Sequence, residues 1–167
     1  YKAINIDNQF NHKLVGVLVD IKSIWCALQY DFIQLARNTS EDDNARIKRY
    51  IFINDVIVRI RAFWERLIGL AILVDRPEEF DKVFSNRRTR RAFKREFASS
   101  KNSVTKLIWD YSHSLDLFEN KFRTPELHKI GRTIRWASKK RLSGEINRLL
   151  AYQNDLNRLI RQIVEIV

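Results

Sequence analysis

The chain has 167 residues, of which 45% are hydrophobic and 31% charged, and its formal net charge is +11. This length suits one domain with a well-filled core, and the composition excludes a disordered chain. The single cysteine, Cys26, excludes an intramolecular disulfide framework and fits a reducing compartment.

Residues that break helices are few, with 4 glycines and 2 prolines in the whole chain. Along most of the sequence the apolar residues recur at spacings of three and four, which predicts amphipathic helices. No apolar run is long enough to span a bilayer, and no signal peptide is recognisable. We therefore expect a cytoplasmic protein with no membrane partner.

Residues 1–10 are expected to form a loosely organised arm, and the first helix to run over residues 11–37. This helix is apolar on more than one side, so we expect it at the centre of the bundle, with Cys26 as a small core residue. Its apolar positions are Leu14, Leu18, Ile21, Trp25, Leu28, Phe32 and Leu35. Ser40 and the three acidic residues behind it predict the start of a second long helix, over residues 41–74 and about 50 Å long.

A short helical insertion is predicted around residues 77–97, because Pro77 ends the second helix. Phe93 and Phe97 are expected to anchor it to the core. Three further helices are expected: residues 101–121 after a cap at Ser99 or Ser100, residues 125–142 after a cap at Thr124, and residues 143–167. The sequence thus predicts an all-α fold. It is a single domain over residues 1–167, an up-and-down bundle of four to five main helices, two of them long.

The net charge is concentrated in one segment. Residues 1–75 carry 10 basic and 9 acidic groups, whereas residues 84–141 carry 16 basic and 5 acidic groups, a difference of +11. Such a block is typical of a protein that binds a polyanion, although a solvated basic surface without a partner has the same composition. The basic residues that we single out in its first part are Arg87, Arg88, Arg90 and Arg91.

Within this segment, Arg123 and His128 flank a helix start. Thr124 is suited to the N-cap and Pro125 to the first helical position, so the arginine lies just outside the helix and the histidine about one turn inside it. A helix N-terminus attracts anions. An arginine that holds a phosphate beside a histidine that moves a proton is a minimal arrangement for cleaving RNA without metal.

The residues that follow the pair extend its basic character. Lys129, Arg132 and Arg135 recur at spacings of three and form a ridge continuing from His128.

Other chemistries lack a pattern in this sequence. The three histidines and the cysteine do not have zinc-ligand spacing, the glycines are scattered rather than gathered in a phosphate loop, and no acidic cluster resembles a two-metal nuclease site. We therefore expect no metal and no cofactor. His113 lies off the apolar stripe of its helix and is expected at the surface.

With its motif Arg123-Thr124-Pro125-Glu126-Leu127-His128, the chain resembles the HEPN superfamily (higher eukaryotes and prokaryotes nucleotide-binding), helical bundles marked by Arg-x4–6-His. The stretch Arg59-Ile60-Arg61-Ala62-Phe63-Trp64-Glu65-Arg66-Leu67, followed by the charged residues of the 80s, is similar to an uncharacterised bacterial branch. The resemblance covers about residues 11–165. Thr124 follows the motif arginine where Asn, Asp or His is often found.

The resemblance implies a metal-independent endoribonuclease, often the toxic part of a toxin–antitoxin or anti-phage system, with two motifs facing one cleft in a homodimer. It implies that Arg123 holds the scissile phosphate and that His128 acts as general base or acid, forming a 2′,3′-cyclic phosphate. It also implies that the ridge of Lys129, Arg132 and Arg135 follows the RNA backbone in a salt-dependent way. In such a complex Trp136 and Tyr111 are candidates for stacking on a base, although a core position is the simpler expectation for either. Expected partners are RNA, a second copy of the chain and an antitoxin or inhibitor protein. Two alternatives stay open: a HEPN-like domain that binds nucleotide or nucleic acid without cutting it, and a helical interaction module with a basic face.

Overall fold

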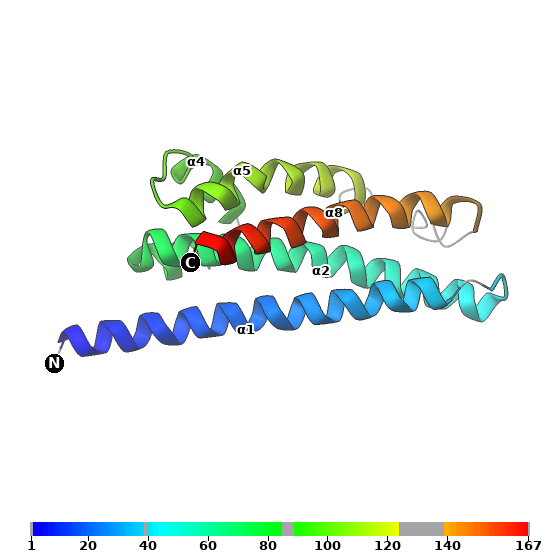
Figure 1. Cartoon of the computed structure of the whole chain (residues 1–167), viewed down its shortest axis with the longest axis horizontal. Coiled ribbons are helices and arrows are strands. Elements are labelled where there is room, and N and C mark those ends of the chain that lie inside the picture. The colour runs from blue at the N-terminus through cyan, green and yellow to red at the C-terminus, as the bar shows by residue number, and fades with distance from the viewer. Residues whose placement is uncertain (1, 39, 85–88, 124–138, 167) are drawn as a thin grey trace.

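The computed structural model describes residues 2–38, 40–84, 89–123 and 139–166, and for 2–7, 89–90, 123, 139–143 and 145 it describes the backbone alone. The described residues form helices and no strand, which confirms the all-α prediction. Four main helices run alternately up and down the bundle (Figure 1): α1 (Lys2–Arg37), α2 (Asp43–Asp75), α5 (Ser103–Phe118) and α8 (Lys139–Ile166).

The predicted insertion is confirmed as a group of short helices between α2 and α5: η1 (Pro77–Glu79), α3 (Phe80–Phe84) and α4 (Thr89–Glu96). Phe93 and Phe97 are fully buried, as expected, and their rings stack with centroids 5.4 Å apart. Gly69 of α2 allows the close approach of α3, because a Cβ at this position would lie 2.7 Å from the Phe84 ring.

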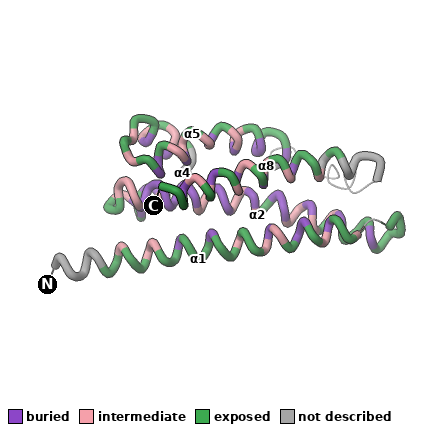
Figure 2. The backbone as a smooth tube through the Cα atoms, in the orientation of Figure 1, coloured by how far each residue is buried: buried purple, intermediate pink, exposed green. Residues whose placement is uncertain are grey.

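The central helix of the bundle is α2. It packs against α1, α5, α8 and the short helices, and Figure 2 shows buried residues along its length. Every residue from Ile68 to Leu73 is buried, so this part of α2 is covered on all sides. Burying each of the large side chains in this range, those of Ile68, Leu70, Ile72 and Leu73, contributes about 1.5–3 kcal/mol to the free energy of folding.

The prediction that the first helix lies at the centre is wrong, since α1 lies at the edge and packs mainly on α2 (Figure 1). Its Leu18 is 46% exposed and its Trp25 40% exposed, and Cys26 is exposed rather than in the core. The indole Nε1 of Trp25 donates a hydrogen bond of 2.8 Å to Asn157 on α8. Apolar residues on two sides of a helix do not by themselves specify that other helices cover both sides.

Several helix boundaries differ from those predicted. The backbone is already helical from Lys2, so most of the expected arm belongs to α1. Likewise α8 begins at Lys139 and continues through Ser143 and Gly144, where a break was expected. The N-cap of α2 is Asp42, whose side chain accepts a 2.8 Å hydrogen bond from the Ala45 amide, while the Ser40 hydroxyl donates to the Asp42 carboxylate.

The turn between α1 and α2 is closed by Arg49, whose side chain is fully buried. Its guanidinium donates to the carbonyl oxygens of Asn38, at 2.9 Å, and of Ser40. The Glu41 carboxylate lies 3.8 Å from the same guanidinium. Helix ends leave backbone carbonyls without intrahelical partners, and here a buried cation satisfies them.

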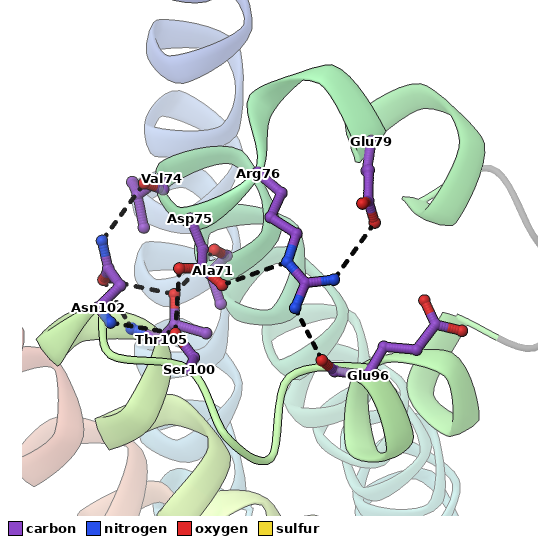
Figure 3. A network of polar contacts seen from close by, with 9 residues as sticks. All are labelled: Ala71, Val74, Asp75, Arg76, Glu79, Glu96, Ser100, Asn102 and Thr105. Atoms are coloured by element: carbon purple, nitrogen blue, oxygen red, sulfur yellow. Dashed lines mark hydrogen bonds and ion pairs between the residues drawn. The ribbon is translucent and has the colours of Figure 1, made fainter.

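At the other end of α2, polar contacts join α2, the short helices and α5 (Figure 3). Asn102 is the N-cap of α5 and accepts a 3.1 Å hydrogen bond from the Thr105 amide, a cap two or three residues later than predicted. The buried Thr105 hydroxyl donates to the Ala71 carbonyl at 2.9 Å. Arg76 donates to the Glu96 carbonyl at 2.9 Å and lies over the Phe97 ring, 4.4 Å from its centroid. These contacts fix where α5 starts.

Candidate functional site

Arg123 is the last residue of η2 (Glu119–Arg123), one turn of π-helix that continues α5. The neighbouring Phe122 is fully buried. Its ring lies 5.6 Å from that of Phe118 and 5.8 Å from that of Tyr152 on α8, centroid to centroid. Aromatic packing therefore fixes the backbone directly before Arg123 against both α5 and α8.

Glu119 fixes the beginning of the same turn to the central helix. Its carboxylate is nearly buried and lies 3.3 Å from Nε of Arg61 on α2, and the Arg61 guanidinium also pairs with Glu65 at 3.0 Å. The turn is thus held by an ion pair on α2 and by an aromatic cluster on α8.

The structure does not test the geometry of the predicted catalytic pair. The side chain of Arg123 is not described, and His128 lies outside the described residues. The same holds for the other predicted RNA contacts Lys129, Arg132, Arg135, Arg87 and Arg88, and for Trp136. The pairing of the arginine with the histidine stays a prediction from the sequence.

Arg90 and Arg91 both belong to α4, where the Arg91 side chain is exposed. The helix is docked on α5, because the Lys94 ammonium pairs with Asp116 and the Trp109 indole donates to the Lys94 carbonyl at 3.1 Å. Lys94, which follows these two arginines in the basic segment, is therefore used in structural contacts. Arg91 presents its charge to solvent on a helix that packing holds in place.

A hollow of about 400 Å³ lies between α5 and α8. Its lining includes Asp110, Tyr111, His113 and Ser114 of α5 and Tyr152 and Asp155 of α8. His113 is exposed as predicted, and Tyr111 is half-buried. No local spacing in the sequence predicts the hollow, because its two walls come from helices whose lining residues lie some forty positions apart.

Two polar groups of the hollow are coupled across the helices. The Ser114 hydroxyl donates to the Asp155 carboxylate at 3.3 Å. Burial raises the pKa of the Tyr152 phenol, and the charge of Asp155 raises it further, against the opposing effect of Arg148. The phenol therefore stays protonated at neutral pH and is available as a hydrogen-bond donor.

Among the described residues, no three His, Cys, Asp or Glu side chains are grouped so that they could hold a metal ion. Within the same part of the chain, no helix combines the length and the apolar character needed to cross a bilayer.

Comparison with known proteins adds no relative: no family model matches the sequence, and neither the curated proteins nor the solved structures include a significant match. The fold therefore defines the class of this protein as an all-α helical bundle. Its function has to be inferred from the residues themselves.

Proposed function

We propose that this chain is a metal-independent endoribonuclease of the HEPN type that cleaves RNA with Arg123 and His128. The observation that carries the proposal is the placement of Arg123 at the end of a π-helical turn held by Phe122 and Glu119. This turn also lies within residues 84–141, the segment that holds the entire net charge. A basic segment attracts the RNA backbone, and a fixed turn can orient a phosphate-binding side chain.

In the proposed reaction the RNA 2′-hydroxyl attacks the adjacent phosphorus and the 5′-oxygen of the next nucleotide leaves. His128 accepts the proton of the 2′-hydroxyl or donates one to the leaving oxygen, as an imidazole with a pKa near neutrality can do. Arg123 neutralises the charge that develops on the phosphate oxygens. The products are a 2′,3′-cyclic phosphate and a 5′-hydroxyl.

The proposal includes a homodimer in which two motifs face one cleft. An apolar row on the outer side of α1 supports the presence of a protein partner. Val15 is 58% exposed, Val19 56% and Ile33 48%, and with the exposed Cys26 they recur at intervals of four and seven residues. An interval of seven places Val19, Cys26 and Ile33 at one heptad position along a helix face, and exposed apolar rows often mark interaction surfaces.

The same row favours a second candidate, a helical interaction module without nuclease activity. Such a module would act as an inhibitor or adaptor whose basic face binds an acidic protein. A third role, binding nucleic acid without cleavage, predicts RNA binding that is tightest at low salt and no products at any pH.

Incubating the purified protein with mixed RNA in EDTA tests the proposal. We expect cleavage by the wild type, with cyclic-phosphate ends, and a rate at least about 10²-fold lower for Arg123→Ala and for His128→Ala. His12→Ala and Arg161→Ala are matched controls, because both residues are exposed. His12 belongs to α1, and Arg161 lies nine residues along α8 from Tyr152, which packs on the π-helical turn. Equal cleavage by the motif variants, or cleavage only with added metal, would refute the nuclease function.

A further inference from the structure

The hollow between α5 and α8 is an open groove with a volume in the range of ligand sites. This volume of about 400 Å³ lies at the small end of the range of about 300–1,000 Å³ that small-molecule sites cover. Beside the residues already named, Leu117 and Arg158 complete the lining, and both are exposed. Two phenol rings, two carboxylates, an imidazole, a hydroxyl and a guanidinium thus line a groove that is open to solvent.

Several polar groups of the hollow are available to a ligand. Among the residues that the structure describes, Asp110, His113 and Arg158 have no hydrogen-bond or ion-pair partner. Ser114 donates to only one of the two oxygens of the Asp155 carboxylate. An incoming group with N–H donors would therefore find acceptors whose capacity is not used within the described protein.

The charges around the hollow are balanced and do not favour a phosphate. The lining holds two carboxylates, Asp110 and Asp155, and the guanidinium of Arg158, and the charge of Arg148 also acts on Tyr152. A neutral group that donates hydrogen bonds to the carboxylates is favoured.

The hollow also lies close to the proposed phosphate site. Tyr152 forms part of its lining and packs edge-on against Phe122, the residue before Arg123. Leu117, at its end, precedes Arg123 by six residues, which at about 1.5 Å per residue is about 9 Å along the helix axis. A base bound in the hollow would thus lie within one or two nucleotides of a phosphate at Arg123.

Guanine fits these features best among the four RNA bases. Its N1–H and exocyclic N2 amino group are adjacent donors on one edge, which can be accepted together by the two oxygens of a carboxylate. Proteins that read single-stranded RNA commonly stack a splayed base on aromatic rings and bind its Watson–Crick edge. Tyr111 and Tyr152 supply rings, and Asp110 and Asp155 supply carboxylates.

We infer that the hollow between α5 and α8 is a guanine-binding subsite, in which Asp155 or Asp110 accepts hydrogen bonds from the base and the tyrosine rings cover its faces. This inference rests on the proposed function, because it assigns a base preference to the same RNA. It predicts cleavage or binding next to unpaired guanosines.

Binding of labelled 2′-O-methyl oligonucleotides, which lack the attacking hydroxyl, tests the inference without cleavage. The probes are an eight-nucleotide oligo-U and the same strand with a single G, C or A, measured by fluorescence anisotropy at low salt in EDTA. We expect the single G to lower Kd at least about fivefold for the wild type, as a bidentate base contact does. C and A should have less effect.

In Asp155→Asn and Asp110→Asn we expect the preference for G to fall below twofold in at least one variant, while oligo-U binding is retained. Glu165→Gln is the matched control, because it removes a carboxylate from an exposed position on α8 outside the hollow. Asp110 is exposed, so its variant preserves the fold even if Asp155→Asn does not.

The possible failures separate the two proposals. Oligo-U binding with no preference for G, or a G preference that both variants retain, overturns the guanine subsite and leaves RNA binding intact. Absence of binding to every probe at low salt overturns RNA binding and the subsite together. A preference for C or A overturns the assignment of guanine.

Discussion

The buried carboxylate of Asp31 should make the stability of this protein depend on pH. Asp31 is 1% exposed, and Nε of Arg59 on α2 lies 3.0 Å from its carboxylate. Burial raises the pKa of Asp31 to about 6, Arg59 opposes the shift, and Asp55 adds to it. Desolvation therefore has a larger effect on this carboxyl group than its ion pair has.

The direction in which pH changes the free energy of unfolding follows from the number of protons bound by the folded and unfolded states. Between the unfolded pKa of 3.8 and the folded pKa of about 6, the folded state holds a proton that the unfolded state has released. The free energy of unfolding contributed by Asp31 is therefore greatest below the lower value and decreases as the pH rises through this window. At about 1.4 kcal/mol per pKa unit, the loss is at most about 3 kcal/mol and is complete near pH 7.

Asp31→Asn removes this titration. We expect the variant to match the wild type near pH 4 and to be more stable by up to about 3 kcal/mol at pH 7, because Arg59 is about one-third exposed and can turn to solvent. Urea unfolding followed by circular dichroism between pH 4 and pH 8 measures the difference. Asp20→Asn, on the same helix but at a half-exposed carboxylate, is the control and should give a smaller and flatter difference.

The reasoning about Asp31 is refuted if the difference between variant and wild type does not grow between pH 4 and pH 7. A variant that is less stable at pH 7 would mean that the ion pair with Arg59 outweighs the burial of the charge.

Three further predictions concern the packing of the bundle and the proposed dimer. Arg49→Met should lower the free energy of unfolding by about 3 kcal/mol and the Tm by roughly 10 °C, because two carbonyls at the α1–α2 turn lose a charged donor. The control variant Arg46→Met, at a half-exposed position one turn earlier, should lower the free energy of unfolding far less. Thr105→Val keeps the shape of a buried side chain but removes its hydrogen bond to the Ala71 carbonyl, so urea unfolding should show a loss of about 1 kcal/mol, and no loss would mean that the bond contributes nothing net. Val19→Glu should convert the proposed dimer to a monomer in light scattering if α1 forms the interface, whereas an unchanged mass would place the interface elsewhere.

The class of the fold could be predicted from local patterns alone. The low number of glycines and prolines and the three-and-four spacing of apolar residues predicted every main helix that the structure describes. The insertion around residues 77–97 was recognisable from Pro77 and from the buried anchors Phe93 and Phe97. Helix ends were less well predicted, because Asp42 and Asn102 cap their helices in place of nearby serines that are equally suitable by sequence.

Only the residue types and the charge of the candidate site could be predicted from the sequence. The Arg123–His128 motif and the charge of residues 84–141 are visible in the sequence. The packing around the motif is not visible in the sequence, since the π-helical turn is held by Tyr152 and by Arg61, which lie far from it along the chain. The hollow beside the turn likewise combines residues of α5 and α8 that share no local pattern.

The sequence by itself determined that this protein is helical, where its helices lie and which segment carries its charge, because these properties depend on neighbours within a few residues. Only the tertiary structure decided that α2 rather than α1 is central, that Cys26 faces solvent and that Asp31 is buried beside Arg59. An apolar stripe indicates that a helix face prefers to be covered, but which element covers it is set by the packing of the whole bundle.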